Sequence, residues 1–284
     1  MTQSKIVSTY VALICNFLLF CLKLCAGLIS GSIALISDAV NSFTDIFTSI
    51  AIMISVRVAH KHPDETHPFG HHRAEPIGGL VAAVVAILLA FEIIKESILM
   101  IFTPHVIVIS KFVIFVVLFT ILLKSVMFFY FKYVSKKHNS PAINALSYDS
   151  INDVLVTLSV LIGLVLYYFK APYYVDGIIG VIIGIWIIRN AMVIGLENMN
   201  YLMGRRPSNE VVEHIISVTK SIKGVKGTND VFAHFVGPFV HVEIHVEVDR
   251  KMSLEKAHEI GNTVKHKLQD IGIVDRAFVH IDPR

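Results

Sequence analysis

The sequence is poor in charged residues. Asp, Glu, Lys and Arg make up 17% of its 284 residues, against about 25% in ordinary soluble domains, whereas 54% of the residues are apolar. The three cysteines, Cys15, Cys21 and Cys25, all lie in the first apolar stretch, which excludes a secreted disulfide framework and a cysteine-based zinc finger. The formal net charge of +3 is too small to indicate a nucleic-acid partner. A membrane protein is the class that remains.

Six apolar stretches are long enough to cross a bilayer. About 20 helical residues span a ~30 Å hydrocarbon layer, and the stretches run at about 8–29, 33–57, 77–101, 106–133, 142–169 and 174–197. The first is longer than a signal-peptide core and has no obvious cleavage site, so we expect it to be retained. If the helices alternate, nearly all the loop lysines and arginines lie on one side of the membrane. This bias predicts a multi-pass protein with both termini in the cytoplasm.

The composition changes near residue 205, where charge density rises and the apolar runs become shorter. Residues 209–222 and 253–270 are predicted as helices, and residues 225–236, 239–249 and 273–281 as strands. We therefore expect a six-helix transmembrane domain at 1–204 and a cytoplasmic α+β ferredoxin-like domain, of order αββαβ, at 205–284. Within the second strand, alternate residues from Val240 to Val248 are apolar and should face the core.

Two of the apolar stretches carry polar pairs. Asn41 and Asp45 are four residues apart, as are Asp149 and Asp153, so each pair lies on one face of its helix. A carboxylate at the centre of a bilayer costs at least ~2.5 kcal/mol and requires a partner or a function. Counting 1.5 Å of rise per residue places both pairs at about the same depth. The pattern predicts an acidic cation site that can also take up protons.

Two other interpretations compete for the polar residues. The carboxylates can instead cap helix kinks or pair with lysines of the apolar stretches, namely Lys23, Lys95 or Lys124. An intramembrane metallohydrolase would need buried histidine ligands and a general base, but the sequence has no deep histidine and no His-Glu-x-x-His motif. We therefore expect a carrier rather than an enzyme.

The histidines indicate metal chemistry outside the membrane. Asp64, His67 and His71 follow the second apolar stretch at short spacing, and carboxylate with neutral imidazole suits first-row divalent metals. A hydrated histidine-rich loop without a metal fits the same spacing.

These residues resemble those of the cation diffusion facilitators, a family that exports divalent metals from the cytoplasm by proton antiport. The resemblance covers nearly the whole chain. It rests on four motifs: Ser37-Asp38-Ala39 with Asn41 and Asp45; His67-Pro68-Phe69-Gly70-His71 with Arg73-Ala74-Glu75; Asp149 with Asp153; and Val279-His280-Ile281-Asp282-Pro283.

The resemblance implies a homodimer in a lipid bilayer, most simply a bacterial plasma membrane, with protons as the counter-ion. It implies three metal sites: a transport site of Asn41, Asp45, Asp149 and Asp153; a loop site of Asp64, His67 and His71; and a C-terminal regulatory site of His245, His258, His280 and Asp282. A metal sensor that does not transport, built on the same scaffold, is an alternative.

The transport site departs from the zinc members of the family, which usually place a histidine where this chain has Asp149. An all-oxygen set favours Mn²⁺ as the substrate, with Zn²⁺ and Fe²⁺ as alternatives. Asn229 also stands where zinc members that resemble this chain have a histidine, so the pattern does not predict a full binuclear C-terminal site.

Overall fold

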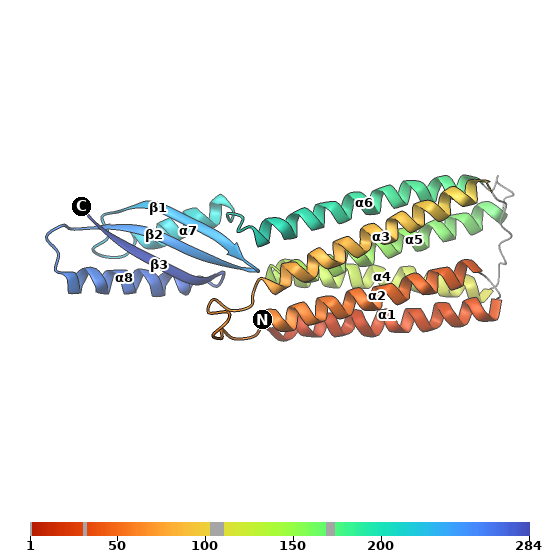
Figure 1. Ribbon diagram of the computed structural model, residues 1–284, viewed down its shortest axis with the longest axis horizontal. Coiled ribbons are helices and arrows are strands. Elements are labelled where there is room, and N and C mark those ends of the chain that lie inside the picture. Colours follow the sequence, from red (N-terminus) through yellow and green to blue (C-terminus); the bar gives the residue numbers. More distant parts are fainter. Residues whose placement is uncertain (1, 31–32, 103–110, 169–173) are drawn as a thin grey trace. The chain divides into compact units, whose positions relative to one another are not determined.

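The structure is a computed structural model, which describes residues 2–30, 33–102, 111–168 and 174–284 (Figure 1). The chain divides into two compact units, Met1–Met199 and Asn200–Arg284. The first unit is helical, whereas the second combines helices with a sheet.

Six long helices make up the described residues of the N-terminal unit. They are α1 (Thr2–Ser30), α2 (Ile33–Ala59), α3 (Ala74–Phe102), α4 (Lys111–His138), α5 (Pro141–Tyr168) and α6 (Tyr174–Leu202). Each predicted apolar stretch overlaps one of them. Within the described residues, four helical segments are long and apolar enough to cross a membrane: Ser4–Ala26, Ala74–Leu99, Lys111–His138 and Gly177–Leu202. The other two helices, α2 and α5, carry the polar pairs, and the count of six spans stays a prediction.

In helix α4, large apolar side chains face outward and a charged side chain faces the interior of the bundle. Leu122 and Phe129 are 64% and 70% exposed, whereas Lys124, between them in sequence, is 1% exposed. The inward face of α4 packs through Phe131 against Leu146 and its neighbours in the core. Large apolar side chains outside and a charged one inside are the pattern expected for a helix that faces lipid.

Helices α3 and α6 approach closely because of glycine. A Cβ atom added at Gly180 would collide with the side chain of Ser97, and one at Gly184 would collide with Ile94. The four-residue spacing of these two glycines permits such close packing of two helices.

The C-terminal unit has the predicted order of elements. They are α7 (Asn209–Lys220), β1 (Gly227–Val236), β2 (Phe239–Val248), α8 (Leu254–Gln269) and β3 (Val274–Pro283). In the sheet, β2 lies between β1, to which it is antiparallel, and β3, to which it is parallel. Gly237, with a φ of +61°, lies in the tight turn that joins β1 to β2.

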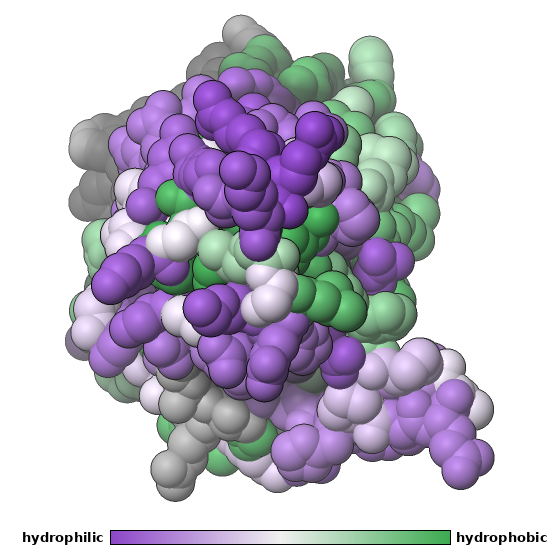
Figure 2. All heavy atoms as spheres, turned by 90° about the vertical axis from the view of Figure 1, so that its left-hand side faces the viewer, coloured by the Kyte–Doolittle hydropathy of each residue, from purple (hydrophilic) through white to green (hydrophobic). Residues whose placement is uncertain are grey.

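The core of this unit lies on one face of the sheet. The alternate residues of β2 from Val240 to Val248 are all buried, as predicted, and they pack with Ile215 of α7 and Leu268 of α8. The surface of the C-terminal unit is mostly hydrophilic (Figure 2). A water-exposed domain therefore follows the apolar bundle in the chain.

Candidate metal sites

Three carboxylates from two helices meet inside the bundle. Asp45 of α2 and Asp149 and Asp153 of α5 each offer one oxygen, and these oxygens lie within 4.8 Å of one another. Asp45 and Asp153 are buried, whereas Asp149 is partly buried. Two oxygens on opposite sides of a cation, at bond lengths of about 2.0–2.6 Å, are ~4–5 Å apart. The three oxygens are therefore spaced to hold one divalent cation. The side chain of Asn41, the fourth predicted ligand, lies outside the described residues.

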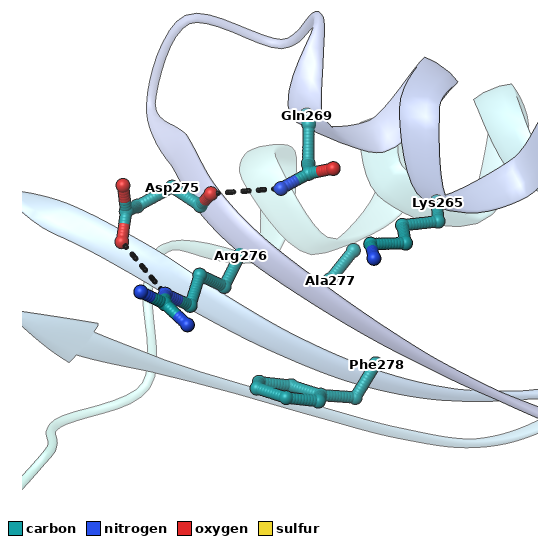
Figure 3. Close-up of a pocket in the computed structure, with 6 residues that line it drawn as sticks. All are labelled: Lys265, Gln269, Asp275, Arg276, Ala277 and Phe278. Carbon is teal, nitrogen blue, oxygen red and sulfur yellow. Dashed lines mark hydrogen bonds and ion pairs between the residues drawn. The ribbon is translucent and has the colours of Figure 1, made fainter. Parts of the chain in front are cut away.

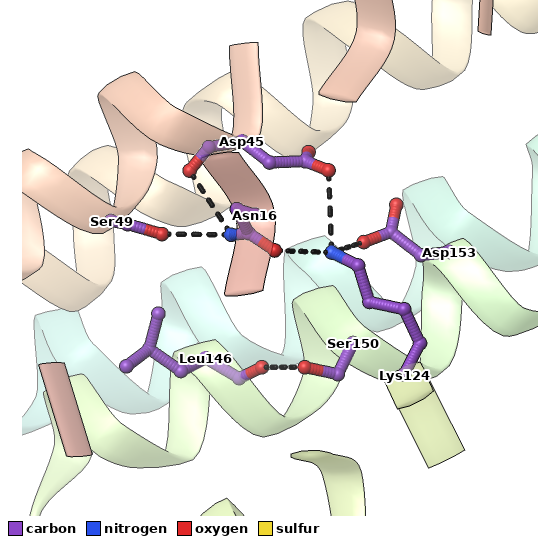
Figure 4. Close-up of polar contacts among 7 residues, drawn as sticks. All are labelled: Asn16, Asp45, Ser49, Lys124, Leu146, Ser150 and Asp153. Atoms are coloured by element: carbon purple, nitrogen blue, oxygen red, sulfur yellow. Dashed lines mark hydrogen bonds and ion pairs between the residues drawn. The ribbon is translucent and has the colours of Figure 1, made fainter. Parts of the chain in front are cut away.

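A lysine from a third helix joins this cluster. The Lys124 ammonium forms ion pairs with Asp153 Oδ2 and with Asp45 Oδ2, the latter at 3.3 Å (Figure 4). The pairing of carboxylates with an intramembrane lysine, an alternative from the sequence, thus holds for Lys124. Three carboxylates and one ammonium have a formal charge of −2, so the lysine does not neutralise the cluster.

The other two lysines named from the sequence differ in their surroundings. Lys95 pairs with Glu92 at 2.7 Å on an exposed part of α3, whereas Lys23 is buried in α1 and its charge also acts on Asp45.

Asn16 of α1 completes the surroundings of the ammonium, and sequence reasoning did not find it. Its Oδ1 accepts a hydrogen bond of 2.8 Å from Lys124. Its amide nitrogen donates to Ser49 Oγ at 2.9 Å and to the Asp45 backbone oxygen at 3.4 Å. These bonds fix the amide with its oxygen toward Lys124. The signals available in the sequence were a lone amide in an apolar stretch and the four-residue spacing of Asp45 and Ser49.

A second buried ion pair joins the beginnings of three helices. Lys5 Nζ of α1 lies 2.7 Å from Glu75 Oε1 of α3, and Ser140, which precedes α5, donates to Glu75 Oε2 at 2.6 Å. Both charged side chains are almost fully buried. Glu75 belongs to a motif quoted above, but its partners could not be predicted from that motif.

The loop between α2 and α3 brings Asp64, His67 and His71 together. One ligand atom from each lies within 4.8 Å of the others, and both imidazoles lie 3.4 Å from an oxygen of Asp64. Hydrogen bonds from the Thr66 hydroxyl and the His67 backbone amide lower the pKa of Asp64 to about 2. The carboxylate is therefore ionised near neutral pH and can bind a cation beside two imidazoles.

A third cluster lies on the sheet of the C-terminal unit. His245 of β2 and His280 of β3 are paired in register, and Asp282 lies 3.2 Å from His245 Nδ1 and 3.3 Å from His280 Nε2. These three residues offer ligand atoms within 4.8 Å. Asn229 donates to Asp282 at 3.4 Å, so it lies where a further ligand would be placed. His258 is exposed on α8 and lies outside this cluster.

A hollow of about 320 Å³ lies between α8 and β3 (Figure 3). Lys265 and Phe278 line it, and Gln269 donates to the backbone oxygen of Asp275 at 3.1 Å. The Asp275 carboxylate is itself paired with His241 Nε2 at 3.1 Å. None of the three ligand clusters found among the described residues lies here, so the hollow is not a candidate metal site.

Two family models together match nearly the whole chain. Residues 9–203 match the cation efflux transmembrane domain, and residues 207–284 match the cytoplasmic domain of cation efflux proteins, which is a dimerisation domain. The chain is 38% identical to an uncharacterized transporter of Methanocaldococcus jannaschii over 94% of each chain. It is 28% identical to the manganese efflux system protein MneS of Bacillus subtilis, over 96% of this chain and 93% of MneS.

A solved MamM CTD, in a cadmium form, is 26% identical to this chain, with a TM-score of 0.26, and the match covers 27% of this chain and 96% of that one.

Proposed function

The chain belongs to the cation diffusion facilitator family of metal efflux transporters, and we propose that it exports Mn²⁺ from the cytoplasm in exchange for protons. The observation that carries the proposal is the cluster of Asp45, Asp149 and Asp153, whose oxygens lie within 4.8 Å inside an apolar bundle. An excess of buried carboxylate requires a bound cation or bound protons, because unpaired charge is costly in a medium of low dielectric constant. A metal cation and protons can therefore replace each other at this one site.

The choice of Mn²⁺ rests on ligand chemistry. The cluster supplies carboxylate oxygens without an imidazole nitrogen, and Zn²⁺ favours nitrogen and sulfur ligands in tetrahedral sites. The relatives named for manganese efflux in Bacillus subtilis are 28% and 26% identical to this chain, which supports the same assignment. Asn41, four residues before Asp45, would add a neutral oxygen.

In the proposed cycle, the protein spans the membrane six times and keeps both termini in the cytoplasm of a plasma membrane. A cation from the cytoplasm binds the three carboxylates, the helices move to open the site to the other side, and protons replace the ion. Asp64, His67 and His71 would bind metal in the loop between α2 and α3.

We assign regulation to the C-terminal unit. His245, His280 and Asp282 would bind a metal near the interface of a homodimer, without His258, which is exposed on α8 outside this cluster. Because Asn229 takes the place of a histidine, we propose one ion per cluster rather than two.

Uptake into everted or reconstituted vesicles tests the function. Mn²⁺, Zn²⁺, Fe²⁺ and Co²⁺ are supplied in parallel, and internal pH is recorded with metal content. We expect the fastest uptake for Mn²⁺. Protons should leave the vesicles during this uptake, so the internal pH should rise only when the metal is supplied. Faster uptake of Zn²⁺ or Fe²⁺ would assign a different substrate, and an absence of uptake in folded protein would favour a sensor.

A further inference from the structure

The Lys124 ammonium lies where a bound cation would have to lie. It pairs with Asp45 and Asp153, and both belong to the three-carboxylate cluster. A divalent ion bonded to the same oxygens would lie beside a positively charged nitrogen, and like charges repel strongly at such distances in a buried site. The ammonium and the ion are therefore competitors for one pair of carboxylates.

We propose that Lys124 is a tethered counter-cation, which holds Asp45 and Asp153 when the divalent substrate has left and is displaced when the substrate binds. This inference rests on the proposed function, because it takes the carboxylate cluster as the transport site. The exchange makes and breaks no covalent bond. One cation, fixed to α4, replaces another that is free to leave.

Asn16 gives the ammonium an acceptor that does not belong to the carboxylate cluster. Its oxygen lies 2.8 Å from Lys124 Nζ, and its amide nitrogen is held by Ser49. A neutral acceptor of fixed orientation lets the ammonium keep one hydrogen bond while it gives up the carboxylates. Asn16 is thus a positioning residue for Lys124 rather than a metal ligand.

Asp149 offers the incoming ion its first contact. Among the described residues, Lys124 forms ion pairs with Asp45 and Asp153, whereas its charge acts on Asp149, the less buried carboxylate of the cluster, from beyond ion-pair distance. An ion can therefore bind Asp149 before the ammonium moves, and the two exchange places without leaving three carboxylates bare. The ion therefore binds Asp149 first, because Lys124 is paired with the oxygens of Asp45 and Asp153.

The consequence is an affinity low enough for release. Three buried carboxylates without a competitor would hold a divalent ion tightly and slow its departure. A tethered ammonium favours the ion-free arrangement at the same oxygens, so it weakens binding and speeds release. A lysine that only holds helices together would have no such effect on affinity.

The test measures Mn²⁺ affinity of the full-length protein in lipid nanodiscs by calorimetry, at mildly alkaline pH where protons compete least. We expect Lys124→Gln to bind Mn²⁺ about tenfold more tightly than the wild type. Its melting temperature should be lower without metal and should rise more on addition of Mn²⁺. Lys124→Arg, which keeps the charge, should remain close to the wild type. Lys5→Gln, which removes a buried lysine paired outside the cluster, is the matched control and should leave the affinity unchanged.

Folded Lys124→Gln that binds Mn²⁺ no more tightly than the wild type would overturn the proposal. If Lys124→Gln does not fold, Asn16→Ala serves instead. The displaced ammonium then lacks its acceptor, so weaker Mn²⁺ binding supports the proposal, and unchanged or tighter binding overturns it. Failure of the proposed function looks different, because Asp153→Asn would then transport Mn²⁺ as well as the wild type does. Wild-type transport that requires Asp153, together with neither the tightening expected for Lys124→Gln nor the weakening expected for Asn16→Ala, would reject only the role of Lys124.

Discussion

Among the described residues of the helical unit, Lys5 and Lys124 form buried ion pairs with carboxylates, and the two clusters differ in their balance of charge. Lys5 meets Glu75 alone, and Ser140 satisfies the second carboxylate oxygen. Lys124 meets a group of three carboxylates and leaves a formal charge of −2. A balanced, hydrogen-bonded pair is complete in itself, whereas an unbalanced one requires another cation. The difference separates a structural ion pair from a candidate transport site.

The largest expected effect is the loss of transport when the unbalanced cluster loses a ligand. Asp45→Asn and Asp153→Asn should each reduce Mn²⁺ flux in vesicles by more than ~100-fold, since even outer-shell partners of a metal cost 10–100-fold. Asp45→Ala and Asp153→Ala should do the same without unfolding the protein. Glu92→Gln, which removes a carboxylate from an exposed pair on α3, is the control and should transport normally.

Breaking the balanced pair should affect stability instead. Glu75→Gln leaves the Lys5 ammonium buried without its counter-charge, and loss of one partner of a buried pair costs about 3–5 kcal/mol. We expect a lower melting temperature with nearly normal Mn²⁺ flux per folded molecule. Normal stability combined with lost transport would show that this pair also takes part in function.

The kind of ligand in the unbalanced cluster should set its selectivity. Asp149→His combined with Asn41→Asp keeps three carboxylates and replaces the amide with an imidazole, so the formal charge of the ligands stays at −3. The ratio of Mn²⁺ to Zn²⁺ transport rates at a fixed proton gradient should fall by about tenfold, because imidazole raises affinity for Zn²⁺. An unchanged ratio in a folded, active double variant would indicate that helix packing sets selectivity.

Near neutral pH, the metal affinity of the loop site should not depend on the protonation of Asp64. A pKa lowered to about 2 keeps this carboxylate charged, and its charge is lost only as the pH falls through that value. Thr66→Val removes the hydroxyl donor and moves the pKa of Asp64 back toward its ordinary value of about 3.9. Metal affinity of the loop between about pH 5 and 8 should not change in this variant, whereas His67→Ala, which removes a proposed ligand, should lower the affinity. A shifted profile in Thr66→Val would contradict the assignment.

The smallest effect concerns the C-terminal cluster. The domain from about residue 206 should fold and dimerise alone, and divalent metal should tighten the dimer modestly through His245, His280 and Asp282. Calorimetry on the isolated domain, with His280→Ala as the control, measures this binding. Absence of binding would remove the regulatory proposal and leave the transport site untouched.

The sequence was most informative where periodicity decides structure. Helix lengths, the order of elements after residue 205 and the buried alternation from Val240 to Val248 followed from apolar spacing. The convergence of Asp45 with Asp149 and Asp153 followed from matching depth in two helices. Depth does not fix helix rotation, however, so the sequence did not determine which lysine would face these carboxylates or that Asn16 would join them. The pair of Lys5 and Glu75, 70 residues apart, depends on tertiary packing in the same way.

Pulsed electron paramagnetic resonance of Mn²⁺ tests the central claim most directly. The full-length protein carries alanine at the four histidines of the loop and C-terminal clusters, namely His67, His71, His245 and His280, so that only the carboxylate cluster remains. The account predicts about one Mn²⁺ bound per protomer, without coupling to a histidine nitrogen, and loss of this signal in Asp153→Asn. Bound Mn²⁺ that persists in Asp153→Asn, or that couples to nitrogen, would contradict it.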